Sequence, residues 1–168
     1  MSEEIDELEK IISSKNEESF ISFTLNHSNE QLVQLRTDYQ TKFSRDFLKD
    51  LESNFSGDFL NVMIGLYKTP VEYDADLLYQ AMKGLGSDKD VISEVLSFRT
   101  PERMNEIKIK FQEKYGKDLI KEIKSETSGD YQKIILHLLE GNRNINTSPN
   151  LENCQKLQKK YMMQEKEN

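Results

Sequence analysis

An internal repeat constrains the fold of this chain more than any other feature of its sequence. The segment KFSRDFLKDLESNFSGD (residues 42–58) aligns without gaps to KYGKDLIKEIKSETSGD (residues 114–130), with each residue 72 positions from its partner. Seven of the seventeen pairs are identical. A fixed offset over such a segment indicates a duplicated supersecondary block. The chain is therefore predicted to contain two copies of one unit, at residues 3–69 and 73–143, joined near Thr69-Pro70.

Apolar residues recur at helical intervals throughout the chain, and no alternating run is long enough to predict a strand. We therefore expect an all-α protein with about five short helices in each copy. Helix-start signals separate the apolar groups: Ser87 with Asp90 resembles a capping box, and Thr100 precedes a proline at a first helical position. In the second copy these groups lie at residues 77–82, 91–96, 104–115, 119–123 and 131–139.

The last segment, residues 144–168, begins with turn residues and then offers helical spacing from about Pro149. Leu151, Cys154, Leu157 and Tyr161 recur there at intervals of three to four. We expect one amphipathic helix in this segment, without the rest of a third unit.

Composition and charge exclude several functional classes. The net charge of -7 argues against a protein that follows nucleic-acid phosphates with basic patches. The acidic start MSEEIDELEK lacks the apolar stretch of a signal peptide, and no segment approaches the roughly 18 apolar residues that span a bilayer. One cysteine, Cys154, cannot build a disulfide framework. We therefore expect a cytoplasmic protein without a membrane-spanning segment.

The segment MKGLGSDKD (residues 82–90) places two glycines between two helical patterns. A helix end leaves free carbonyls, and glycines allow the backbone to turn so that the carbonyl oxygens converge. Met82, Gly84 and Gly86 can supply three such oxygens to a hard cation such as Ca²⁺, which also needs a carboxylate. Taken alone, the turn is more typical of a helix that ends in a left-handed glycine than of a metal site.

The first copy helps to choose between these readings of the glycine turn. Its equivalent segment, IISSKNEES (residues 11–19), has no glycine. The 72-residue offset also pairs Glu126 of the second copy with Asn54 of the first. Glycines and carboxylate are thus present together in one copy and absent together in the other, as a shared ligand would require.

These segments resemble the annexin family. AMKGLGSDKDVISEVLSFRT is similar to the annexin K-G-x-G-[ST] turn and the helix after it, and KDLIKEIKSETSGDYQKIILHLLEGNR is similar to the end of an annexin repeat. Gly86 and Glu126 are 40 residues apart, as the family's calcium-site pattern asks. The resemblance implies right-handed superhelical repeats: residues 3–69 as repeat one with a degenerate calcium site, 73–143 as repeat two with an intact one, and 144–168 as a linker and partial helix of a third.

The resemblance also implies a function. Annexins bind acidic phospholipid membranes when Ca²⁺ is present, and here the ion would be held by the carbonyls of Met82, Gly84 and Gly86 and by a bidentate Glu126. Lipid phosphate would complete the ion's shell, while Lys83 would meet a headgroup and Leu85 would enter the membrane interface. The protein would then be cytoplasmic and would join membranes peripherally when calcium rises.

Departures from the family pattern leave a second reading open. The family core has four repeats and this chain has two, so apolar faces would be exposed or covered by a second copy or a missing half-core partner. The alternative function is therefore a calcium-independent helical interaction or dimerisation module. No nucleophile has a base beside it, no phosphate-binding loop follows a strand and no zinc spacing occurs, so we expect no enzymatic activity.

Overall fold

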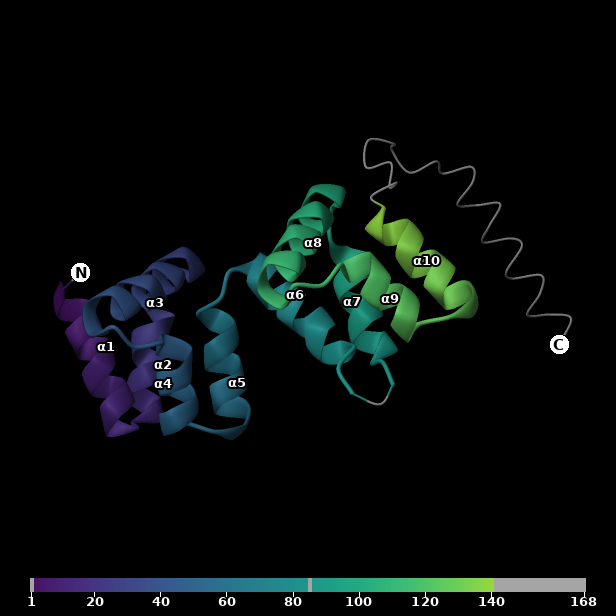
Figure 1. Ribbon diagram of the computed structural model, residues 1–168. Coiled ribbons are helices and arrows are strands. Elements are labelled where there is room, and N and C mark those ends of the chain that lie inside the picture. The colour runs from purple at the N-terminus through teal and green to yellow at the C-terminus, as the bar shows by residue number, and fades with distance from the viewer. Residues whose placement is uncertain (1, 85, 141–168) are drawn as a thin grey trace, which may run out of the picture.

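The computed structural model describes residues 2–84 and 86–140, and within those ranges it contains ten α-helices and no strand. The helices form two groups, which lie side by side in Figure 1. The all-α prediction is confirmed. The predicted amphipathic helix after Pro149 and the predicted membrane contact Leu85 lie outside the described residues.

The first group contains helices α1 to α5. Their bounds are Ser2–Ser14, Glu17–Leu25, Asn29–Phe43, Phe47–Asn54 and Gly57–Leu66. The second group contains helices α6 to α10. Their bounds are Pro70–Ala81, Lys89–Phe98, Pro101–Tyr115, Leu119–Glu126 and Gly129–Leu139. The division at residues 3–69 and 73–143 stays a prediction, but Thr69 and Pro70 open α6 as its N-cap and first residue.

The helices after the first in each group follow the 72-residue offset. Helices α2, α3, α4 and α5 begin 72 positions before α7, α8, α9 and α10. Their local signals match as well: Asp46 and Asp118 cap α4 and α9, and Gly57 and Gly129 begin α5 and α10 with φ near 64° and 67°. Equal spacing of caps and turns explains why both copies form the same helices.

Each group of helices has its own hydrophobic core. The first is rich in aromatic rings, and Phe20, Phe47 and Tyr67 lie at its centre with ring centroids 4.6–5.8 Å apart in the contacting pairs. The second is mainly aliphatic, with Leu78 and Ile92 fully buried. Burial of these side chains stabilises each group by the removal of apolar surface from water.

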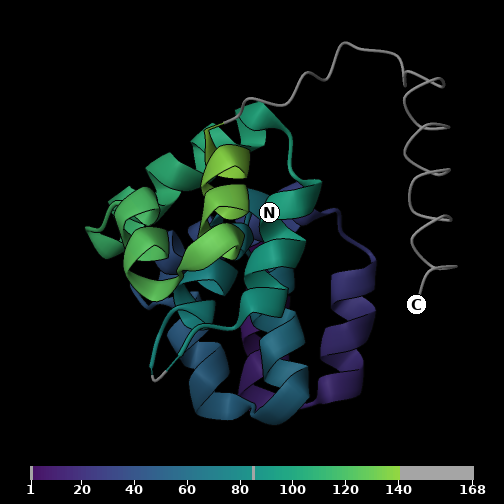
Figure 2. The same ribbon diagram turned by 90° about the vertical axis from the view of Figure 1, so that its right-hand side faces the viewer.

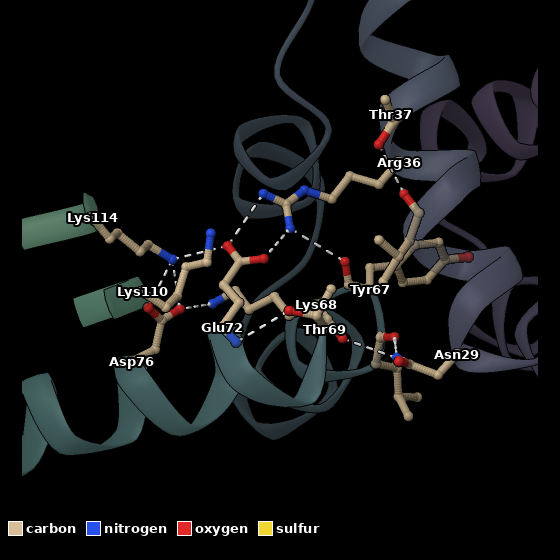
Figure 3. A network of polar contacts seen from close by, with 12 residues as sticks. Asn29, Arg36, Thr37, Tyr67, Lys68, Thr69, Glu72, Asp76, Lys110 and Lys114 are labelled. Carbon is tan, nitrogen blue, oxygen red and sulfur yellow. Dashed lines mark hydrogen bonds and ion pairs between the residues drawn. The ribbon is translucent and has the colours of Figure 1, made fainter. Parts of the chain in front are cut away.

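Ion pairs join the two groups where α3 faces α6 (Figure 3). The Arg36 guanidinium of α3 donates to Glu72 of α6 at 2.8 and 3.3 Å. Lys114 of α8 lies 3.0 Å from Glu72 and 2.7 Å from Asp76, and Lys68 lies 2.6 Å from Asp76. Burial raises the pKa of Glu72 and of Asp76, but hydrogen bonds and charges from these cations outweigh it and lower both pKa values. Both carboxylates are therefore ionised and paired.

None of the described helices is long and apolar enough to cross a membrane.

Candidate metal site at the glycine turn

The turn between α6 and α7 extends away from the second group of helices (Figures 1 and 2). Helix α6 ends at Ala81, and the Met82 N–H donates back to Leu78 and Tyr79 as the C-cap. The turn closes where the Asp88 N–H donates to the Ala81 carbonyl at 2.8 Å. Residues 82–88 thus form a loop whose two ends are fixed to each other.

Both glycines of this turn have positive φ, at 113° for Gly84 and 88° for Gly86. No atom lies within 4 Å of the position of an added Cβ at either residue, so the backbone conformation alone requires glycine there. The carbonyls of Met82, Gly84 and Gly86 accept no hydrogen bond from another described residue. Three backbone oxygens are therefore available to an external ligand.

Glu126, the last residue of α9, lies beside this turn. The Ser87 hydroxyl donates to the Glu126 carbonyl at 3.0 Å, so the residue after Gly86 contacts the residue that carries the predicted carboxylate. The Glu126 side chain is half-buried and makes no hydrogen bond or ion pair with the described residues. Lys83, the predicted headgroup contact, is exposed on the same turn.

The capping box predicted from Ser87 and Asp90 is wrong. Asp88 is the N-cap of α7, and its carboxylate accepts from the N–H groups of Asp90 and Val91 at 3.1 Å. Ser87 precedes the cap, and its hydroxyl is bonded to Glu126 instead. Asp88 directly follows Ser87 in the sequence, and aspartate is as strongly preferred at an N-cap as serine.

Sequence reasoning also missed a second hydroxyl contact beside the turn. The Tyr131 hydroxyl of α10 donates to the Lys89 carbonyl at 2.9 Å and lies 3.1 Å from the Ser93 hydroxyl. The Lys89 ammonium lies 5.4 Å from the centre of the Tyr131 ring. The repeat gave a signal for this contact, because the partner of Tyr131 in the first copy is Phe59, which lacks the hydroxyl.

The oxygen donors of this turn suit a hard cation. Ca²⁺ prefers carbonyl and carboxylate oxygens and accepts flexible geometry, whereas zinc prefers sulfur and nitrogen. Nowhere in residues 2–84 and 86–140 do three or more His, Cys, Asp or Glu side chains gather as a metal cluster. A metal at this turn would thus depend on the backbone oxygens, with Glu126 supplying negative charge.

The corresponding turn of the first group offers none of these features. Only residues 15 and 16 separate α1 from α2, and Lys15 adopts a φ of 56°. Asn16 caps α2 by accepting from the Ser19 N–H at 2.9 Å. At the position of Glu126, the Asn54 amide donates to the Asp50 carbonyl at 2.8 Å. The first group therefore keeps the helices without the loop or the carboxylate.

Comparison with known proteins gives the chain its family. The annexin family model matches residues 5–66 and 73–138. Annexin A7 of Homo sapiens is 34% identical over 135 residues, covering 80% of this chain and 28% of that protein. Annexin A5 of Rattus norvegicus is 35% identical over 133 residues, covering 79% of this chain and 42% of that protein. The chain thus spans less than half the length of these curated relatives.

Solved structures agree with this assignment. Chicken annexin V is 30% identical with a TM-score of 0.75, over 84% of this chain and 45% of that chain. A calcium-bound annexin, (Sm)1, is 25% identical with a TM-score of 0.73, over 87% of this chain and 45% of that chain. Family model, curated relatives and fold therefore coincide, and the chain belongs to the annexin family.

Proposed function

We propose that this chain binds Ca²⁺ through the carbonyls of Met82, Gly84 and Gly86 and a bidentate Glu126, and that the bound ion attaches it to acidic phospholipid membranes. The observation that carries the proposal is the hydrogen bond from the Ser87 hydroxyl to the main-chain carbonyl of Glu126 at 3.0 Å, which places the glycine turn beside the residue that carries the carboxylate. That carboxylate makes no hydrogen bond or ion pair with the described residues. Membership of the annexin family and the calcium-bound state of the related annexin (Sm)1 support the choice of ion.

Electrostatics explains why the ion acts as the switch. The chain carries a net charge of -7, and an anionic leaflet has a surface potential of about -30 mV, so the two repel each other without a cation between them. A Ca²⁺ ion on the turn would accept lipid phosphate oxygens as further ligands. The exposed Lys83 would add a contact to a headgroup, and Leu85 would enter the interface. The protein would remain cytoplasmic and would associate peripherally when calcium rises.

The test is sedimentation with phosphatidylserine vesicles over a range of Ca²⁺ concentrations, followed by EGTA. We expect the wild type to pellet with Ca²⁺ and to return to solution with EGTA, and Glu126→Gln to stay in solution. Glu52→Gln is the matched control, because Glu52 is an exposed carboxylate on α4, the counterpart of α9. Equal pelleting of wild type and Glu126→Gln would contradict the proposal.

A second candidate function is a calcium-independent interaction module. It is favoured by exposed apolar side chains on α2 and α5, where Leu25 is 80% exposed and Val62 57%. Contiguous apolar surface of this kind marks interaction sites. A second copy of the chain or a missing half-core partner would cover it. Sedimentation equilibrium with EGTA present distinguishes the cases: a concentration-dependent dimer that Leu25→Glu dissociates supports this function, and a monomer at all concentrations contradicts self-association.

A further inference from the structure

Two hydroxyl groups connect the α6–α7 turn to the helix pair that carries Glu126. Ser87, at the end of the turn, donates to the main chain of Glu126 at 3.0 Å. Tyr131, in the first turn of α10, donates to the carbonyl of Lys89 at 2.9 Å. One hydroxyl thus ties the loop to α9, and the other ties the start of α7 to α10. The two contacts lie on either side of Asp88, where the loop closes on Ala81.

The first group shows that the fold does not require either hydroxyl. The 72-residue offset places Lys15 at the position of Ser87 and Phe59 at the position of Tyr131. Phe59 packs on Phe20 and Phe55 with ring centroids 6.1 and 5.1 Å apart, and α5 forms there as α10 does in the second group. Both hydroxyls are present in the copy that has the glycine turn, and both are absent from the other.

We infer that Ser87 and Tyr131 are positioning residues that hold the glycine turn at a fixed distance from Glu126, so that the Ca²⁺ site is formed before the ion arrives. This inference rests on the proposed function. A site of flexible backbone carbonyls must otherwise lose conformational freedom when it binds, and that loss lowers affinity. Backbone contacts at 2.9 and 3.0 Å on both sides of the loop closure remove part of that cost in advance.

The structure also predicts that the Tyr131 hydroxyl can be removed without harm to the fold. The Ser93 hydroxyl donates to the Lys89 carbonyl at 2.6 Å, so this carbonyl keeps a hydrogen bond in Tyr131→Phe. The ring stays in place beneath the Lys89 ammonium, as a phenylalanine ring can also bind a cation. A change in Ca²⁺ affinity in this variant would therefore report on the position of the turn.

The experiment measures the unfolding temperature of the full chain in EGTA and over a titration with Ca²⁺ alone, without lipid. An ion that binds the folded state raises this temperature, and the midpoint of the rise reports affinity. We expect Ser87→Ala and Tyr131→Phe each to need about three- to tenfold more Ca²⁺ than wild type, the value of one lost hydrogen bond. Their unfolding temperatures in EGTA should stay close to wild type, and Ser87→Thr should restore the wild-type midpoint.

Tyr73→Phe is the matched control, because Tyr73 is exposed in the first turn of α6, at the opposite end of that helix from the glycine turn, and its hydroxyl makes no hydrogen bond with the described residues. Wild-type Ca²⁺ midpoints in both Ser87→Ala and Tyr131→Phe would overturn the inference while the proposed function stands. A lower unfolding temperature in EGTA with an unchanged Ca²⁺ midpoint would show a structural role only and would also overturn it. A wild type that Ca²⁺ does not stabilise would overturn the proposed site and the inference together.

Discussion

The two groups of helices differ most in the connection between their first two helices. Residues 15 and 16 join α1 to α2, whereas residues 82–88 join α6 to α7, although α2 and α7 begin 72 positions apart. Helix α1 runs on to Ser14, and α6 ends before Gly84 and Gly86, which both have positive φ. The longer turn is therefore an addition to a unit that folds without it. The glycines of this turn are therefore not required for the helices of the unit to form.

A buried ion pair marks a second difference between the groups. Asp74 of α6 is buried, and the Arg99 guanidinium donates to both of its carboxylate oxygens, at 2.6 and 2.7 Å. In the first group, His27 lies 72 positions before Arg99, and it approaches Glu4 of α1 at 4.0 Å with Glu4 half exposed. The second group thus depends on an ion pair where the first has a loose contact.

The largest expected effect comes from Arg99→Ala. The change leaves the Asp74 carboxylate buried without its cation, and breaking a buried pair in this way costs about 3 kcal/mol of unfolding free energy. Denaturant unfolding measures the loss. The comparison is with His27→Ala in the first group, for which we expect a loss of less than about 1 kcal/mol. Equal losses in the two variants would show that the ion pair does not distinguish the groups.

A smaller loss is expected for Gly84→Ala. An alanine has space there, but a φ of 113° is strained for any residue with a Cβ, at a cost of about 1–2 kcal/mol. Calcium-dependent vesicle binding should weaken in the same variant. Gly116→Ser is the control, because Ser44 holds the equivalent position at a φ of 53°, and we expect unchanged vesicle binding. Wild-type vesicle binding by Gly84→Ala would show that the backbone conformation of the turn does not contribute to the Ca²⁺ site.

Acid should weaken the ion pairs that join the two groups. The pKa of Glu72 in the folded state is lowered from its ordinary 4.5, so its contribution is complete above that value and is lost as pH falls through the folded pKa. We expect Glu72→Gln to cost about 1 kcal/mol at pH 7, and the difference from wild type to shrink below about pH 4.5. Urea unfolding at a series of pH values measures it. If the difference in unfolding free energy between wild type and Glu72→Gln instead grew in acid, the pKa of Glu72 would not be lowered in the folded state.

The smallest expected effect is that of Asn54→Glu, which gives the first group the carboxylate of the second. The connection between α1 and α2 has no glycine loop to supply carbonyls, so the new carboxylate should add no Ca²⁺ binding. Titration calorimetry of Asn54→Glu beside wild type measures the number of ions bound. An additional ion would show that a carboxylate alone suffices and that the difference in the turns is unimportant.

The sequence predicts the helices of this fold better than the contacts around its site. Helical spacing and the 72-residue offset predict the groups of apolar residues, since both follow from local periodicity. The prediction that Thr100 precedes a helix with proline at its first position is also confirmed, because Thr100 is the N-cap of α8 and Pro101 its first residue. The Ser87 contact with Glu126 spans 39 residues and the Tyr131 contact with Lys89 spans 42, so no local pattern reveals them. The ion pairs of Arg36 and Arg99 depend in the same way on how helices pack.

The central claim is that Glu126 and the glycine turn form one Ca²⁺ site in the second group. Titration calorimetry with Ca²⁺ alone, on wild type, Glu126→Gln and Glu52→Gln, tests it most directly. We predict that Glu126→Gln loses at least about tenfold in affinity, the cost of removing a charged ligand, while Glu52→Gln binds as wild type does. Wild-type affinity in Glu126→Gln, or an equal loss in Glu52→Gln, would contradict the claim.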